Sequence, residues 1–109
     1  LSILKLLLQY NLIDINEGAK GINLTPLHIT WKFRNLAIVE YLVNRKNIRV
    51  NEQTLYKKMT ALHYAVEKGF IDIVRVLLTK KEINKNLRNS NGKTAWQFTN
   101  NNEILELFR

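Results

Sequence analysis

The chain lacks cysteine altogether, which excludes disulfide bridges, thiolate zinc sites and cysteine nucleophiles. Acidic residues are scarce, with nine Asp and Glu against seventeen Lys and Arg. No pair of carboxylates is placed for glycoside or phosphoryl chemistry. The two histidines are the only side chains suited to act as a general base. We therefore expect no enzymatic activity, no metal site and no cofactor.

Long apolar runs are also missing. Leu6-Leu7-Leu8 is bounded by Lys5 and Gln9, whereas a membrane-spanning helix needs about 20 apolar residues, so we expect no transmembrane segment. Hydrophobic residues nevertheless make up 46% of the chain, too many for a disordered segment. The formal net charge of +8 favours acidic partners through long-range attraction. The absence of cysteine fits a reducing compartment, and we expect an intracellular protein, cytoplasmic or nuclear.

An internal repeat organises the sequence. Residues 1–16, 36–51 and 71–86 share one apolar pattern, each copy starting 35 residues after the one before. Apolar residues at steps of three and four are typical of an amphipathic helix. In the middle copy the expected buried face carries Leu36, Val39, Leu42 and Val43, and the opposite face carries Glu40 and Asn44. The pattern predicts a helix in each copy.

A second motif repeats between these helices. Thr25-Pro26-Leu27-His28 matches Thr60-Ala61-Leu62-His63, and a weaker copy begins at Thr94. Threonine is a good helix N-cap, and proline at the first helical position loses no hydrogen bond. Each unit is therefore predicted to be a short helix, a turn and a second helix, followed by a loop of roughly a dozen residues.

These motifs resemble the ankyrin repeat, whose signature is T-P-L-H-x-A in a unit of about 33 residues. The resemblance implies an all-α, ankyrin-type helix-turn-helix solenoid with β-hairpin finger loops. We expect a single domain over 1–109, divided into a partial repeat (1–16), two repeats (17–51 and 52–86) and a C-terminal capping repeat (87–109). A tetratricopeptide array is the nearest alternative, but the long stretch from Asn16 to Thr25 argues against it. Leu1 would already lie in a second helix, so we expect a further helix upstream in the parent chain.

The sequence departs from the family pattern at two positions that bear on backbone geometry. Arg34 stands where the family prefers glycine between the two helices, whereas Gly69 keeps it. Lys58 aligns with Asn23 and Gly92, residue types that enter left-handed conformations easily. We therefore expect Lys58 to occupy a strained turn.

The two histidines are interpreted as structural. In the family that the chain resembles, this histidine binds backbone groups and ties the finger to the helices, a role expected here for His28 and His63. Gly18-Ala19-Lys20-Gly21 matches the GxxG loop of RNA-binding KH modules, but that fold also needs a sheet. The expected structural motif comprises Thr25, Pro26, Leu27, His28, Thr60, Leu62, His63 and Thr94.

The expected function is binding of another protein on the concave surface formed by fingers and first helices. The partner should be acidic or amphipathic, and the chain a monomeric part of a longer protein. The proposed contact residues are Trp31, Lys32, Phe33, Tyr56, Lys57 and Lys68. The alternatives are a nucleic-acid or anionic-ligand binder using the same basic surface, and a structural spacer in a longer array. Nucleic acid is disfavoured because the basic residues do not form one concentrated stripe.

Overall fold

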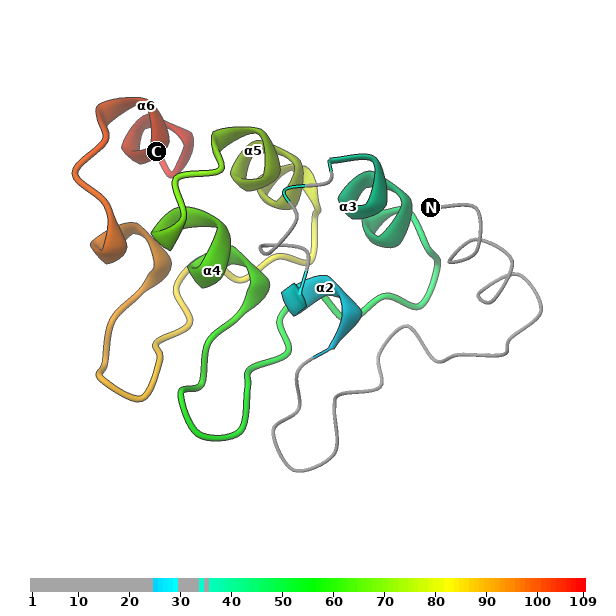
Figure 1. Ribbon diagram of the computed structural model, residues 1–109, viewed down its shortest axis with the longest axis horizontal. Coiled ribbons are helices and arrows are strands. Elements are labelled where there is room, and N and C mark those ends of the chain that lie inside the picture. Colours follow the sequence, from blue (N-terminus) through cyan, green and yellow to red (C-terminus); the bar gives the residue numbers. More distant parts are fainter. Residues whose placement is uncertain (1–24, 30–33, 35) are drawn as a thin grey trace.

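The computed structural model describes residues 25–29, 34 and 36–109 (Figure 1). These residues form α2 (Pro26–Ile29), α3 (Leu36–Val43), α4 (Ala61–Glu67), α5 (Ile71–Thr79), the 3₁₀ helix η2 (Ala95–Phe98) and α6 (Asn102–Leu107). Trp31, Lys32 and Phe33, which were predicted to contact a partner, lie outside the described residues.

The helices are arranged in two layers. α2, α4 and η2 lie side by side in one layer, α3, α5 and α6 lie in the other, and long loops project from the foot of the molecule (Figure 1). α4 packs against α2, η2 and α5, whereas α5 packs against α3 and α6. Each unit therefore contacts its neighbours in the stack, and the predicted all-α solenoid is confirmed.

The core repeats with the sequence. Val39 and its equivalent Val74 are both 0% exposed, as are Leu42 and Leu77. Glu40 lies on the exposed face of α3, as the apolar pattern predicted. Burying each aliphatic side chain of this size stabilises the fold by about 1.5–3 kcal/mol. The core cluster consists of Leu27, Val39, Leu42, Val43, Val50, Ala61, Leu62, Ala65, Val66, Ile73, Val74, Leu77, Ala95 and Ile104.

The first helix of each unit starts as the motif predicted. Pro26 is the first residue of α2. The hydroxyl of Thr60 accepts a hydrogen bond of 3.2 Å from the backbone N–H of His63 in the first turn of α4. Thr94 caps the last unit, but η2 is a single 3₁₀ turn because Thr99 already has an extended backbone. The last unit is thus shorter than the one before it.

The projecting loops are closed by hairpin-like hydrogen bonds. In the loop at 54–59, hereafter the first finger, the N–H of Thr54 donates to the carbonyl of Met59 at 2.9 Å. In the loop at 89–93, the second finger, the N–H of Asn89 donates to the carbonyl of Lys93 at 2.9 Å. No residue in the described part of the chain belongs to a β-strand, because pairing this short does not form a ladder.

Left-handed backbone occurs where the repeat alignment placed it. Lys58 has φ 55° and the aligned Gly92 has φ 76°, so the strained turn predicted at Lys58 is confirmed. Arg34 has φ 43°, like its equivalent Gly69 at 73°. A non-glycine residue in this region pays a steric cost from its Cβ atom.

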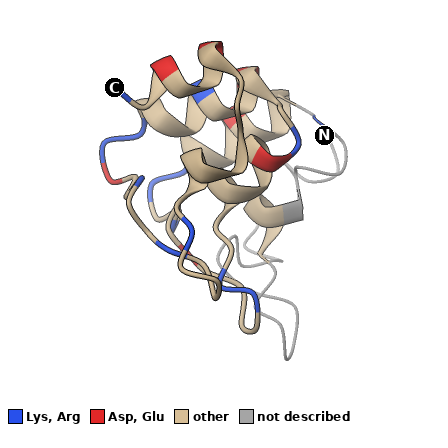
Figure 2. Ribbon diagram, turned by 90° about the vertical axis from the view of Figure 1, so that its left-hand side faces the viewer, with Lys and Arg blue, Asp and Glu red and all other residues tan. Residues whose placement is uncertain are grey.

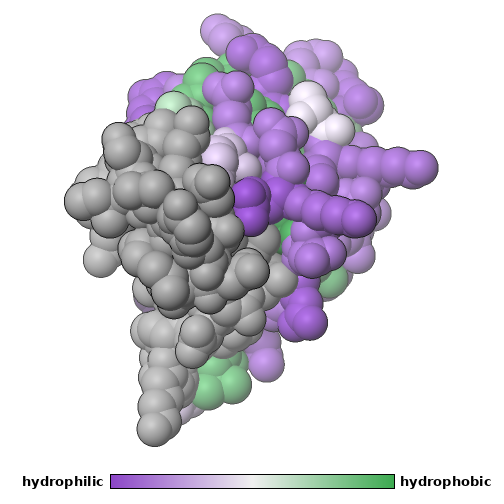
Figure 3. All heavy atoms as spheres, turned by 90° about the vertical axis from the view of Figure 1, so that its right-hand side faces the viewer, coloured by the Kyte–Doolittle hydropathy of each residue, from purple (hydrophilic) through white to green (hydrophobic). Residues whose placement is uncertain are grey.

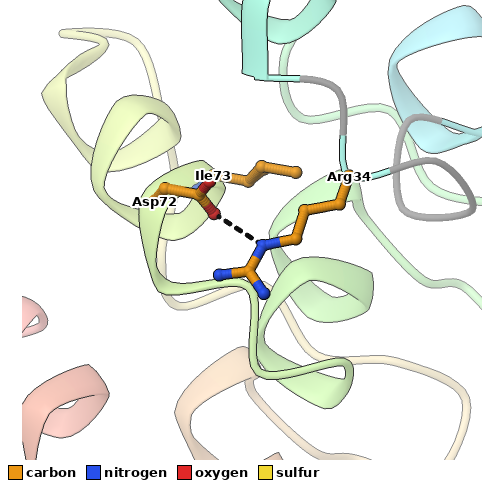
Figure 4. A network of polar contacts seen from close by, with 3 residues as sticks. All are labelled: Arg34, Asp72 and Ile73. Carbon is orange, nitrogen blue, oxygen red and sulfur yellow. Dashed lines mark hydrogen bonds and ion pairs between the residues drawn. The ribbon is translucent and has the colours of Figure 1, made fainter.

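Arg34 makes contacts that a glycine could not make. Its Nε donates to Oδ1 of Asp72 at 3.3 Å, linking the turn after α2 to the first turn of α5 (Figure 4). Its guanidinium carbon lies 4.8 Å from the ring centroid of Phe70. The side chain thereby joins neighbouring units, which offsets part of the backbone strain.

Candidate partner-binding surface

His63 connects the helix of its own unit to the finger of the next. Its Nδ1 lies 3.1 Å from the backbone nitrogen of Thr60, which donates to it. Its Nε2 lies 2.9 Å from the carbonyl oxygen of Lys93 in the second finger. Because Nδ1 accepts a backbone N–H, the proton of the neutral imidazole must sit on Nε2, which donates to Lys93.

His28 makes the same arrangement one unit earlier. Its Nδ1 accepts from the backbone N–H of Thr25 at 2.9 Å. Its Nε2 lies 2.8 Å from the carbonyl oxygen of Glu52, which precedes the first finger, and 3.1 Å from that of Met59, the last residue of the finger. Both histidines therefore fix a finger to a helix in the stack.

Burial favours the neutral form of both imidazoles. His28 and His63 are each 1% exposed. Loss of hydration lowers the pKa of each below its ordinary value of 6.5, although the carbonyl groups that they face act in the opposite direction. A buried neutral imidazole with both nitrogens engaged cannot serve as a proton carrier to a bound substrate.

An aromatic side chain from the following unit covers each imidazole. The rings of His28 and Tyr64 meet edge to face with centroids 6.1 Å apart. The rings of His63 and Phe98 meet in the same way at 5.8 Å. Tyr64 and Phe98 occupy equivalent positions one residue after the histidine site of their own units. Sequence analysis did not single them out, although this repeat equivalence was visible.

The two fingers are bonded to each other. The backbone N–H of Ser90 donates to the carbonyl of Lys57 at 2.9 Å. The side-chain amide of Gln53 donates to the carbonyls of Lys58 and Arg88, both at 2.9 Å. Since hydrogen bonds hold neighbouring fingers in register, their exposed side chains are presented from a shared framework.

A concavity of about 230 Å³ lies between the two fingers and the inner helices, by which we mean the first helix of each unit, here α4 and η2. Its finger side is formed by Lys57 and Met59 and by the tip of the second finger, and its helix side by Tyr64, Glu67 and Phe98. The complete lining is Lys57, Met59, Tyr64, Glu67, Asn89, Ser90, Asn91 and Phe98. The concave surface predicted as the binding site thus contains a hollow with apolar, amide and charged groups together.

Of the predicted contact residues, Lys57 lines this hollow, whereas Tyr56 and Lys68 are sequence neighbours of lining residues. Tyr56 precedes Lys57 in the first finger and is 74% exposed. Lys68 is exposed at the end of α4, next to the lining residue Glu67. Leu55 beside Tyr56 is 45% exposed and adds apolar surface at the finger. Figure 3, which views one end of the stack, shows hydrophobic atoms at the foot of an otherwise mainly hydrophilic described surface.

The electrostatics of the hollow are mixed. Lys57 and the nearby Lys93 are exposed cations, and the ammonium group of Lys93 lies 5.8 Å from the ring centroid of Phe98. Glu67 is the one acidic residue in the lining. Burial raises the pKa of Tyr64, and the charge of Glu67 raises it further, although a hydrogen bond with Thr54 acts to lower it. The phenol of Tyr64 thus remains a neutral hydrogen-bonding group at neutral pH.

The described residues offer no group of three or more His, Asp or Glu side chains that could hold a metal ion. In the same part of the chain, no helix has the length and apolarity to cross a membrane.

Comparison with known proteins agrees with this architecture. A family model described as ankyrin repeats in three copies matches residues 1–89 and 46–107. Alpha-latrotoxin-Lg1a of Latrodectus geometricus is 35% identical over 97 residues, covering 87% of this chain and 7% of that protein. Alpha-latrotoxin-Lhe1a of Latrodectus hesperus is 33% identical over the same share. The ANK repeat-containing protein nipk-1 of Caenorhabditis elegans is 31% identical over 65% of this chain and 12% of its own length. The chain therefore spans a small part of each relative.

A solved structure shows the same fold. The ankyrin repeat domain of Bcl-3, described as a unique member of the IkappaB protein family, superposes with a TM-score of 0.85 at 24% identity. The match covers 96% of this chain and 44% of that domain's chain. Ankyrin repeats generally act as protein–protein interaction modules. The family model spans nearly all of the sequence, and the chain belongs to the ankyrin repeat family.

Proposed function

We propose that this chain binds an acidic, extended segment of a partner protein along its fingers and inner helices. The observation that carries the proposal is the hollow between the first finger, the second finger and α4, which is lined by Lys57, the residue after the exposed Tyr56. Aromatic residues are enriched at protein interfaces, where a few aromatic anchors supply most of the binding energy, while neighbouring lysines act through long-range attraction.

Each part of the surface has a distinct expected role. Tyr56 is the anchor, since its ring can bury a large apolar area at little entropic cost. Lys57 and Lys68 attract acidic side chains over distance, so they should act mainly on the association rate. The amide of Asn91 and the hydroxyl of Ser90 can bind the backbone of an extended segment, because both line the hollow at the finger tip.

The proposal is tested with a partner recovered by pull-down and identified by mass spectrometry. The variant Y56A/K57E/K68E should remain folded and lose at least about thirtyfold in affinity, which corresponds to about 2 kcal/mol from the aromatic anchor. The matched control is K46E/K81E, which changes the net charge by the same amount on loops away from the fingers. It should keep the partner affinity within a few-fold.

Two results would contradict the proposal. If the triple variant is folded and binds the partner with full affinity, the finger surface is not the site. If the chain instead binds unrelated single-stranded oligonucleotides equally well, with an affinity that falls steeply as salt rises, it is a nucleic-acid binder. Surface plasmon resonance in low and high salt separates these outcomes, because it measures association and dissociation rates independently.

A further inference from the structure

The strongest concentration of positive charge lies away from the fingers. The loops that follow α3 and α5, at 44–51 and 80–87, contain six Lys or Arg residues and one Glu, a net +5 within a chain of net +8. Figure 2 shows these blue segments along one edge of the molecule, close to the C-terminal residue. We call the two loops and Arg109 the basic edge.

Hydrogen bonds hold the two loops next to each other. The side-chain amide of Asn51, at the end of the first loop, donates to the carbonyl of Glu82 at 2.8 Å. Its Oδ1 accepts from the backbone N–H of Asn84 at 2.7 Å. The charges therefore repeat along the stack: Arg45 and Lys46 occupy the positions that Lys80 and Lys81 occupy one unit later.

A concavity of about 540 Å³ is hollowed into this edge. Four cations line it, while Leu78, Ile83 and Leu107 supply apolar surface and two asparagines supply amide donors. None of the lining residues is acidic. The cationic and amide lining is Lys80, Lys81, Lys85, Arg109, Asn84 and Asn86.

Intramolecular partners satisfy these cations only in part. Lys80 lies 3.7 Å from Glu82, and Arg109 lies 3.3 Å from Glu106, with exposed carboxylates in both pairs. Surface pairs of this kind are weak and give way to a better ligand. Lys85 donates to the carbonyl of Phe108 at 2.8 Å, which holds its ammonium group at the wall of the concavity. Lys81 is exposed and has no ion-pair partner within the described residues.

We propose that this concavity binds a compact ligand carrying two or more phosphate groups. Several ammonium groups and a guanidinium around one hollow suit phosphate oxygens, which accept many charge-assisted hydrogen bonds at once. The hollow exceeds what one phosphate would fill, and its cations come from the loop after α5 and from the segment after α6. An extended polyanion could bind exposed cations anywhere on the surface, whereas a compact ligand requires the cations that line this concavity.

The site is independent of the finger surface. No lining residue of the finger hollow lines this concavity. A ligand here and a partner protein on the fingers can therefore be measured separately, with different variants and different probes.

The phosphate groups could belong to a soluble compound or to a lipid headgroup, and tripolyphosphate and lipid vesicles distinguish these two sources. Calorimetric titration with tripolyphosphate should show one site, and vesicles of phosphatidylcholine with a bisphosphorylated phosphoinositide should bind where pure phosphatidylcholine does not. Binding of the vesicles alone identifies a lipid headgroup, and binding of tripolyphosphate alone identifies a soluble phosphate compound. If neither probe binds at low salt, the proposal is wrong.

The variant K80Q/K81Q should lower the affinity for the bound probe at least about tenfold, since each lost charged contact contributes that much or more. The control K57Q/K68Q removes the same charge from the finger side and should change the affinity less than about threefold. Circular dichroism checks that both variants are folded. Equal losses in the two variants would overturn the proposal, because they would show attraction to the overall charge. If the double variant does not fold, K81Q alone replaces it in the affinity measurement, because Lys81 is exposed.

Discussion

Mild acidification should destabilise this protein through His28 and His63. Burial lowers the pKa of both imidazoles below their ordinary value of 6.5, so the native state keeps them neutral where the unfolded chain takes up protons. Stability is therefore unaffected by these groups above pH 6.5. It should fall as the pH drops below 6.5, until the pH passes the lowered pKa of the native state.

The largest loss can be worked out from this linkage. One pH unit corresponds to about 1.4 kcal/mol for a group that binds its proton only in the unfolded state. Between pH 6.5 and 5.5, each histidine that remains neutral costs at most about 1.4 kcal/mol, and the pair at most about 2.7 kcal/mol. Carboxylates ordinarily titrate at lower pH, so this window isolates the histidines.

His63→Gln is the sharpest test, because the chain already contains the substitute. Gln97 occupies the equivalent position in the last unit, where its Oε1 accepts from the backbone N–H of Thr94 at 2.7 Å. The variant should keep the helix cap but lose the bond to Lys93, costing about 1–3 kcal/mol at pH 7.5. It should also remove about half of the pH dependence.

Urea unfolding followed by circular dichroism at several pH values measures both effects. The parent chain should lose stability from pH 6.5 to 5.5, and the variant should lose about half as much over the same range. A parent chain whose stability does not change across this window would refute the buried neutral state. An unchanged slope in the variant would assign the pH dependence to groups other than His63.

Four further substitutions test the backbone and the contacts between units. Lys58→Gly should leave stability unchanged or raise it by up to about 1 kcal/mol. Gly92→Ala should lower stability by about 1 kcal/mol through strain alone, since no atom lies within 4 Å of the added Cβ. Thermal melts in which Lys58→Gly lowers stability or Gly92→Ala raises it would contradict this reasoning. Asp72→Asn should cost less than about 1 kcal/mol and lose its effect in high salt, because the pair with Arg34 is partly exposed. Asn51→Ala should cost about 0.5–1.5 kcal/mol, because it removes two exposed hydrogen bonds to the next loop whose backbone groups water can then bind. A melt identical to the parent's would exclude a role for Asn51 in holding the loops together.

The repeat offset made the intra-unit features predictable. Aligning the copies predicted the buried face of α3 and the left-handed backbone of Lys58, which aligns with Gly92, and both predictions are confirmed. Such features depend on short-range geometry, which the sequence period specifies directly. The single 3₁₀ turn of η2 was not predicted, because the weaker motif at Thr94 marks where the helix begins and does not fix the backbone that follows.

Contacts between units were harder to infer. The period shows which residues are equivalent, but it does not give the rotation and translation from one unit to the next. The cover of each imidazole by Tyr64 or Phe98, the reach of Arg34 to Asp72 and the pairing of the two basic loops all depend on that relation. The sequence indicated no concentrated stripe of basic residues, whereas stacking brings the basic loops after α3 and α5 together on one edge.

The bond from His63 to Lys93 gives the stack a direction. The donor belongs to one unit and the acceptor to the unit after it, so opening of the second finger leaves a buried donor unpaired in α4. Fraying of the last unit would thus weaken the helix cap of the unit before it. Fraying of that unit would in turn break the bond from His28 to Met59 and weaken the helix cap at α2. Amide hydrogen exchange should therefore show protection that is lost in steps from residue 109 backwards, and His63→Gln should uncouple the last step from the rest.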